Sequence, residues 1–259
     1  MKFGRLIRMN KACFLACDQG LEHGPSDFNE RNIDPEYIMN IAVEGGFSGI
    51  IVGHGIAEKY YRGAYKAVPL IVKLNGKTRL QRGDPLSRQL CSVDRAVKLG
   101  AAAVGYTIYP GSAHAQEMFA EFGRIVEQAH DHGIPVVLWV YPRGEGIDEL
   151  DNKVLAYGAR IGLELGADIL KVKYNGDLEN FKWMLKCAGR AKVVVSGGTK
   201  TEPAAFLKEV HDIVHVAGGT GVAVGRNIWQ DQRPFSLAKA LEQVVFHGKA
   251  PEDVMHLLH

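Results

Sequence analysis

Eight short runs of apolar and β-branched residues recur along the 259-residue chain, and this recurrence constrains its fold more than any other feature. Each run is almost continuously hydrophobic, which is typical of parallel strands covered on both faces. The windows between them are amphipathic, and several end in glycine, which predicts helices that stop just before the next strand. The predicted strands span residues 12–18, 49–55, 69–75, 102–109, 135–142, 167–174, 192–198 and 220–225.

This alternation predicts an α/β fold, a single (β/α)8 TIM barrel that occupies residues 1–259 as one domain. A doubly wound open sheet uses the same alternation and is the alternative fold. Eight units fit the chain length, and no GxGxxG motif follows the first run, so the barrel is favoured. No Ser/Pro-rich linker divides the chain.

Composition argues against several classes of protein. The 31 Lys and Arg residues nearly balance the 29 Asp and Glu residues, and a net charge of +2 is too small to hold nucleic acid. No apolar run approaches the ~18 residues of a membrane helix, and residues 12–17 are too short for a secretory signal. The four cysteines are too few and too scattered for a disulfide framework, so reduced thiols and a cytoplasmic protein are expected.

In a barrel, the catalytic groups lie at the carboxyl ends of the strands, where the loops to the helices begin. Most of the unusual polar residues follow the predicted strands at these ends. They fall in the segments DQGLEHGP (18–25), WVYPRGEG (139–146), KVKYNGD (171–177), SGGTK (196–200) and VGRN (224–227).

Lys171 and Lys173 are two residues apart in the sixth run, so both side chains point to the same face as Ile169. A buried lysine beside a second cation has a lowered pKa and becomes a neutral amine that can form a Schiff base with a carbonyl. The alternative is that both side chains extend to the barrel mouth as structural or phosphate-binding charges. The spacing is compatible with both interpretations.

Trp139 and Tyr141 have the same parity in the fifth run. Cationic neighbours would lower the pKa of the phenol from ~10 and suit Tyr141 to general acid–base catalysis; the alternative is a core aromatic with one hydrogen bond. Asp18 ends the first run, where it would hold a substrate hydroxyl or carry its proton. A helix N-cap or a turn is the structural alternative for Asp18.

Glycines at two consecutive strand ends predict a phosphate site. The loops after the seventh and eighth strands of a barrel often bind phosphate, because glycine lets backbone N–H groups approach the anion. Arg226 would add a charge-assisted contact. The predicted site comprises Ser196, Gly197, Gly198, Gly225 and Arg226.

No metal site is predicted. The histidine pairs 130/132 and 211/215 have spacings that can chelate, but they are expected on helices, away from the barrel mouth. His23 and His54 lie at strand ends without a carboxylate or cysteine in a ligand pattern.

Together these segments resemble the archaeal-type class I fructose-1,6-bisphosphate aldolases. The resemblance runs from about Ala12 to Trp229 and is carried by DQGLEHGP, WVYPRG, GADILKVKY, SGGTK and VGRNIWQ. It implies a single barrel that acts as a lyase in glycolysis and gluconeogenesis. Such an enzyme reversibly cleaves fructose 1,6-bisphosphate to dihydroxyacetone phosphate and glyceraldehyde 3-phosphate through a Schiff base, with neither a metal nor a cofactor.

The resemblance also implies a role for each candidate residue. Lys171 would be the Schiff-base lysine, and Lys173 the neighbouring cation that keeps it partly neutral. Tyr141 would transfer the proton at the carbon next to the imine, Trp139 would shape the site, and Asp18 would handle the substrate hydroxyl. The remaining roles are substrate contacts by Gln19 and His23, one phosphate site at Ser196, Gly197, Gly198, Gly225 and Arg226, and a second phosphate site with Arg143, Lys59 and Arg62 as candidates.

Two other functions stay open. A relative with the same barrel, 2-amino-3,7-dideoxy-D-threo-hept-6-ulosonate synthase, performs a transaldol reaction in aromatic amino-acid biosynthesis and shares similar motifs. A non-catalytic barrel that binds phosphosugars is the second. The family is typically a homo-oligomer, often a decamer, so apolar residues such as Phe119, Phe122 and Phe246 are expected on outer helix faces at subunit contacts.

Overall fold

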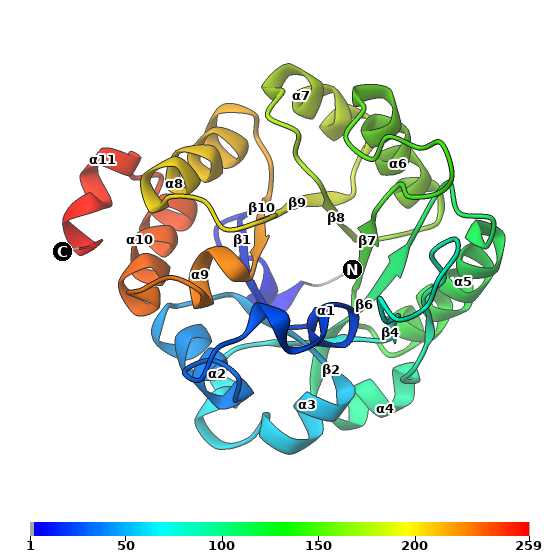
Figure 1. The fold of residues 1–259 in the computed structure, drawn as a ribbon, viewed down its shortest axis with the longest axis horizontal. Coiled ribbons are helices and arrows are strands. Elements are labelled where there is room, and N and C mark those ends of the chain that lie inside the picture. The colour runs from blue at the N-terminus through cyan, green and yellow to red at the C-terminus, as the bar shows by residue number, and fades with distance from the viewer. Residues whose placement is uncertain (1–2, 259) are drawn as a thin grey trace.

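The computed structural model describes residues 3–258, which form a closed barrel of eight parallel strands inside a ring of helices (Figure 1). Around the barrel the strands follow the order β1-β10-β9-β8-β7-β6-β3-β2. Every barrel strand lies within or overlaps one of the eight predicted runs, so the barrel is confirmed and the open sheet was the wrong alternative. The strands are β1 (Ala12–Ala16), β2 (Gly49–Gly53), β3 (Leu70–Lys73), β6 (Ala101–Ile108), β7 (Val136–Val140), β8 (Ile169–Val172), β9 (Lys192–Ser196) and β10 (Gly221–Val224).

Longer helices cover the outside of the barrel, and several begin at a side chain that accepts a hydrogen bond from the first turn. Asp34, Ser92, Asp151 and Asp177 cap four of them in this way. The covering helices are α2 (Pro35–Glu44), α3 (His54–Tyr60), α4 (Val93–Lys98), α5 (Ala115–Asp131), α6 (Asn152–Glu164), α7 (Leu178–Cys187), α8 (Pro203–His211) and α10 (Pro234–His247).

Short elements complete the described chain. At the carboxyl ends of strands lie α1 (Gly20–His23), the 3-10 turn η2 (Gly24–Asp27) and α9 (Arg226–Trp229). A small antiparallel pair, β4 (Asn75–Gly76) and β5 (Arg88–Gln89), follows β3 and was not predicted. The others are η1 (Gly4–Leu6), η3 (Gly63–Ala67), the π-helical η4 (Asp212–Val216), α11 (Pro251–Val254) and η5 (Met255–Leu258).

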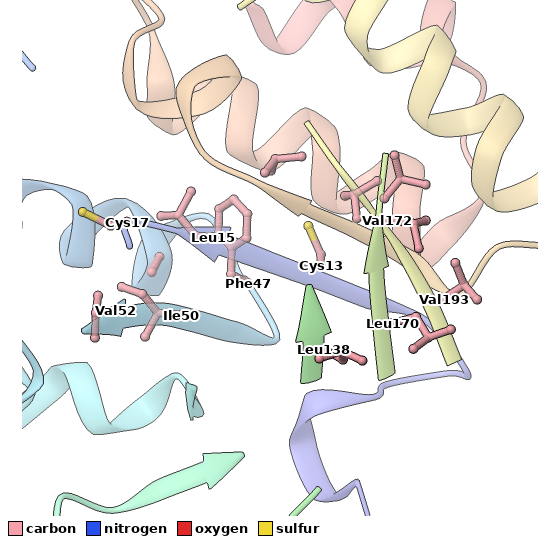
Figure 2. Packing of buried hydrophobic residues seen from close by; sticks show 14 of the residues in the cluster. Cys13, Leu15, Cys17, Phe47, Ile50, Val52, Leu138, Leu170, Val172 and Val193 are labelled. Atoms are coloured by element: carbon pink, nitrogen blue, oxygen red, sulfur yellow. The ribbon is translucent and has the colours of Figure 1, made fainter. Parts of the chain in front are cut away.

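The strands are apolar on both faces because each face packs in a separate cluster. Inward side chains such as Phe14, Ile51 and Ile169 fill the barrel interior, together with Leu6 of η1. Outward side chains pack against the helices, as Figure 2 shows for Cys13, Leu15, Ile50, Val52, Leu170 and Val172 among others. Near-continuous hydrophobicity in the sequence is therefore the sum of two alternating apolar faces.

The expectation for the outer helix faces was wrong for two residues. Phe122 and Phe246 are buried and pack in the layer between strands and helices, and Phe119 packs against that layer. The exposed aromatic residues on the outer helices are instead Tyr157 of α6 and Trp183 of α7. Among residues 3–258, no helix is both long and apolar enough to cross a membrane.

Candidate active site

A cavity of about 900 Å³ opens at the carboxyl ends of the strands. It is the place where the barrel rule locates catalytic groups. All twelve residues predicted for the site line this cavity: Asp18, Gln19, His23, Trp139, Tyr141, Lys171, Lys173, Ser196, Gly197, Gly198, Gly225 and Arg226. Residues from five segments of the sequence thus meet in one pocket.

Lys171 lies on the inner face of β8, above Ile169, and is only 5% exposed. Its Nζ lies 4.8 Å from the centroid of the Trp139 ring on the adjacent strand β7. Burial lowers the pKa of Lys171, while the negative charge of Asp18 acts in the opposite direction. The side chain does not extend to solvent at the barrel mouth, so this structure favours a buried amine over a surface charge.

The cation near Lys171 is Lys73, at the end of β3, and sequence reasoning missed it. Its Nζ lies 5.3 Å from the centroid of the same Trp139 ring. Burial, together with the charge on Lys171, lowers the pKa of Lys73 to about 8, although the charges of Asp18 and Glu22 act in the opposite direction. The signal was present in the sequence, since Lys73 interrupts the apolar run 69–75 just as Lys171 interrupts the run 167–174.

Lys173, expected to be this neighbouring cation, is paired elsewhere. Its Nζ lies 2.5 Å from Oε1 of Glu149, and its side chain is 23% exposed. Lys173 lies beyond the end of β8, where the chain leaves the barrel wall, so its charge is neutralised at the rim. Lys73 takes the place that the sequence analysis gave to Lys173 beside the buried amine.

The pKa expected for Tyr141 was also wrong in direction. Burial raises the pKa of the phenol, and the charge of Asp18 raises it further. Ser196 and Arg143 act in the opposite direction but are outweighed, although the Arg143 guanidinium carbon lies only 5.3 Å from the ring centroid. The phenol is therefore a protonated donor at neutral pH.

The first loop brings three polar side chains into the cavity. Asp18 does not cap α1, because Gln19 occupies the N-cap position and makes no side-chain capping bond. The Nε2 atom of Gln19 is buried and has no hydrogen-bond partner among the described residues. His23 is held by Asp27, with Nδ1 2.6 Å from Oδ2. Gln19 therefore offers an unused donor to a ligand in the cavity.

The two glycine segments lie together in the cavity wall and form a cradle of backbone and Arg226, the arrangement that the predicted phosphate site requires. Gly198 has φ +62, a conformation that an L side chain rarely adopts. A Cβ at Gly225 would lie 2.8 Å from the Ala16 carbonyl oxygen, so the close approach of these strands requires glycine. Arg226 donates to the Gly198 carbonyl over 3.1 Å, which places its guanidinium at the rim of the cradle.

Charged side chains from several loops form a second polar region of the cavity wall. Arg143 pairs with Glu149, Nε to Oε2 at 2.7 Å, and with Glu22, Nη1 to Oε1 at 3.4 Å. Although burial favours the neutral acid, Lys77 and Arg143 hold the pKa of Glu22 below its usual value. Of the three candidates for a second phosphate contact, Arg143 and Lys59 line the cavity and Arg62 does not.

Within residues 3–258 the structure contains no group of three or more His, Cys, Asp or Glu side chains placed to hold a metal ion. His130 is instead bonded to Asp168, with Nε2 2.9 Å from Oδ2, and His215 to the Val244 carbonyl at 2.8 Å. The cavity brings together the amines of Lys171 and Lys73, the carboxylate of Asp18 and the phenol of Tyr141.

Comparison with known proteins gives a consistent result. Residues 12–231 match the DeoC/LacD family aldolase model. The chain is 50% identical over 253 residues to the class 1 fructose-bisphosphate aldolase of Thermoproteus tenax, covering 96% of this chain and 95% of that one. It is 36% identical over 272 residues to the fructose-bisphosphate aldolase/6-deoxy-5-ketofructose 1-phosphate synthase of Methanocaldococcus jannaschii, covering 97% and 87%. A solved archaeal fructose-1,6-bisphosphate aldolase, whose catalytic lysine is covalently bound to the carbinolamine intermediate, superposes with a TM-score of 0.89 at 48% identity and covers 94% of this chain and 98% of that one.

Proposed function

The chain belongs to the DeoC/LacD family of aldolases and within it to the class 1 fructose-bisphosphate aldolases, and we propose from this that it reversibly cleaves fructose 1,6-bisphosphate in glycolysis and gluconeogenesis. The products are dihydroxyacetone phosphate and glyceraldehyde 3-phosphate. The observation that carries the proposal is the buried Lys171 amine at the carboxyl end of β8, in the same cavity as a glycine cradle suited to phosphate.

In the proposed mechanism, the lone pair of Lys171 Nζ attacks the substrate ketone, and the carbinolamine loses water to give an iminium ion. The Asp18 carboxylate then takes the proton of the C4 hydroxyl. The electron pair of that O–H bond forms the aldehyde, the C3–C4 bond breaks, and its electrons pass to the iminium nitrogen as an enamine. The positive nitrogen is the electron sink, so the step needs no metal.

Tyr141 completes the cycle as a general acid. Its phenol is protonated at neutral pH because burial raises its pKa, so it can protonate the enamine at C3. Water then hydrolyses the iminium ion and frees Lys171. Reversal of the same steps joins the two triose phosphates. Trp139 shapes the floor on which the imine forms, since its ring lies under Lys171 Nζ.

We assign one substrate phosphate to the cradle of Ser196, Gly197, Gly198, Gly225 and Arg226, and the other to the charged wall around Arg143. Gln19 and His23 would contact the substrate between them, and the unused Nε2 donor of Gln19 supports its part. Lys173, held by Glu149, would contribute to the charged wall. Binding of two phosphates supplies energy remote from the reacting carbons and orients them.

The alternatives from the sequence are not favoured. The relative with 50% identity is a fructose-bisphosphate aldolase, which argues against the heptulosonate synthase. A non-catalytic barrel would have no use for a buried lysine amine whose pKa is lowered. The four cysteines are free thiols, which supports the cytoplasm as the compartment.

We further propose a homo-oligomer, a decamer as the family resemblance implies. The exposed aromatic residues Tyr157 and Trp183, on the neighbouring helices α6 and α7, are suited to a subunit contact. Light scattering after gel filtration tests this, because replacing both residues by serine should reduce the particle mass. An unchanged mass would remove this surface from the interface, and a wild-type monomer would contradict the oligomer itself.

Replacement of Lys171 tests the function. Cleavage of fructose 1,6-bisphosphate, coupled to oxidation of the triose phosphate, is expected for the wild type and abolished in both Lys171→Met and Lys171→Arg, since arginine stays protonated. Lys182→Met, which removes a lysine from the outer helix α7, is the matched control and should keep full activity. Turnover in Lys171→Met would contradict the mechanism, and a wild type that binds phosphosugars without cleaving any would favour the non-catalytic barrel.

A further inference from the structure

A histidine and a carboxylate form a close pair in the loop after β1. The Nδ1 atom of His23 lies 2.6 Å from Oδ2 of Asp27, and the two side chains are only 13% and 17% exposed. His23 lines the cavity, whereas Asp27 is not among the described residues that line it. The carboxylate therefore contacts the edge of the imidazole ring that points away from the cavity.

This contact selects one form of the imidazole ring. An ionised carboxylate can only accept hydrogen bonds, so Nδ1 of His23 carries a proton, and in the neutral ring Nε2 then has a lone pair. Nε2 lies on the other edge of the ring and makes no hydrogen bond within residues 3–258. It is left to face the cavity as an acceptor, and the sugar chain of a phosphosugar has hydroxyl groups that can donate to it.

Asp27 is itself fixed by the segment that follows β10, the last strand of the barrel. Its carbonyl oxygen accepts a hydrogen bond from Nε2 of Gln230 over 2.7 Å. The next residue, Phe28, stacks on the buried ring of Trp229 with 5.2 Å between the ring centroids. These contacts hold the backbone of Asp27 in place, so its carboxylate can fix the orientation of the His23 ring.

The other carboxylate oxygen of Asp27 faces the proposed phosphate site. Oδ1 lies 3.8 Å from Nη1 of Arg226, while Nη2 of the same arginine donates to the Gly198 carbonyl over 3.1 Å. Arg226 therefore keeps one anchor when Asp27 is replaced. A carboxylate so close to the guanidinium also repels a phosphate bound there. Removing the charge of Asp27 should thus leave phosphate binding unchanged or make it tighter.

We propose that Asp27 is a positioning residue that holds His23 with Nε2 directed at the substrate, so that His23 accepts a hydrogen bond from a hydroxyl group of the sugar chain. Asp27 lies outside the cavity lining and acts through His23. The inference rests on the proposed function for the identity of the substrate. A hydrogen bond to a charged group contributes about tenfold or more to an equilibrium, so loss of this one should lower kcat/KM by about tenfold.

The first test is a double-mutant cycle on kcat/KM for cleavage of fructose 1,6-bisphosphate. Asp27→Asn should lower kcat/KM about tenfold, because the amide can donate to Nδ1 and so favours the opposite tautomer of the ring. In a His23→Ala background, the same change should have an effect of about twofold at most, since Asp27 acts through His23. Glu30→Gln removes an exposed carboxylate from the same segment and should keep the wild-type value. Losses that multiply in the double variant would overturn the proposal.

Inhibition by inorganic phosphate distinguishes positioning of His23 from a collapse of the loops. Phosphate competes with the substrate for the proposed site at Arg226, which keeps its contact with Gly198. Asp27→Asn should be inhibited at the same phosphate concentration as the wild type or at a lower one, although its kcat/KM has fallen. Weaker inhibition would overturn the proposal, because Asp27 would then support the phosphate site directly.

Labelling by diethyl pyrocarbonate reports on the ring without turnover, because this reagent acylates an imidazole nitrogen that has a lone pair. Peptide mass mapping should show that His23 is labelled several-fold more slowly in Asp27→Asn than in the wild type. Equal labelling in the folded variant would overturn the proposal, and Asp27→Ser takes its place if Asp27→Asn does not fold. Failure of the proposed function is distinguishable, since the wild type would then fail to cleave fructose 1,6-bisphosphate while the difference in His23 labelling remained.

Discussion

In Gly105→Ala, the added methyl group should displace the Trp139 ring, which lies next to the amines of Lys171 and Lys73. A Cβ at Gly105 would lie 2.3 Å from Cζ3 and 2.4 Å from Cη2 of Trp139. Carbon atoms pack at roughly 3.5 Å or more, so in Gly105→Ala the ring must move by about 1 Å. Trp139 is only 2% exposed and has little room to move. Overpacking of this kind costs about 1–3 kcal/mol of unfolding free energy.

The same displacement should affect catalysis, because Lys171 and Lys73 both lie over the ring. A misplacement of about 1 Å in a reacting group can cost about a hundredfold in rate. Urea unfolding and the kcat for fructose 1,6-bisphosphate cleavage measure the two effects separately. Gly123→Ala is the matched control: it lies in α5 with no heavy atom near its Cβ, and it should be up to ~1 kcal/mol more stable than the wild type.

A double variant identifies the cause. If the clash is the reason, Gly105→Ala combined with Trp139→Leu loses less stability than the two single changes added together. The smaller leucine leaves room for the added methyl group, and the methyl group fills part of the space that the tryptophan ring leaves. The double variant should not regain kcat, since it lacks the Trp139 ring that lies next to Lys171 Nζ. Wild-type stability together with wild-type kcat in Gly105→Ala would refute this reasoning.

Three further predictions follow from the site. Arg226→Ala should weaken binding of dihydroxyacetone phosphate about 10- to 100-fold by calorimetry, through loss of a charge-assisted contact; unchanged affinity would move the phosphate elsewhere. Tyr141→Phe should still form the imine, detected by borohydride trapping, but lose turnover; full turnover would exclude Tyr141 as the acid. Because burial lowers the pKa of Lys73 to about 8, the unfolded chain binds more protons than the folded one between about pH 8 and 10.5, and this group makes the wild type more stable as the pH rises. Relative to Lys73→Met, the wild type should gain up to about 3 kcal/mol in urea unfolding between pH 7.5 and 10, and a pH-independent difference would contradict the shift.

The barrel could be predicted because each of its strands is recognisable from a short stretch of the sequence. A strand that is covered on both faces shows a continuous apolar run, and eight such runs with helical windows between them leave few architectures. Strand parity also placed Lys171 correctly, since Ile169 on the same face fills the barrel interior. Phe122 lies on the same face of α5 as Met118 and Ile125, and this apolar stripe faces the barrel, so the periodicity of the helix places Phe122 inside. Phe246 is likewise among the buried residues of α10.

The predictions that were wrong concern side chains whose surroundings are set by contacts between distant segments of the chain. Lys73 interrupts one apolar run, and nothing near it in sequence reveals that a tryptophan 66 residues later reaches it across Gly105. The pKa of Tyr141 depends on how deeply the phenol is buried, and that depth outweighs the cation that the sequence suggested. Lys173 was assigned from its spacing to Lys171 and from the family resemblance, but its partner Glu149 comes from another loop.

The most direct test of the central claim is intact-mass spectrometry after incubation with dihydroxyacetone phosphate and borohydride, followed by peptide mapping. A single reduced adduct on Lys171 is expected, because its amine is buried, has no hydrogen bond to the described residues and lies in the same cavity as the proposed phosphate site. An adduct on Lys73 or Lys173 would contradict the assignment of roles. No adduct, with dihydroxyacetone phosphate still bound by calorimetry, would contradict Schiff-base chemistry in this cavity.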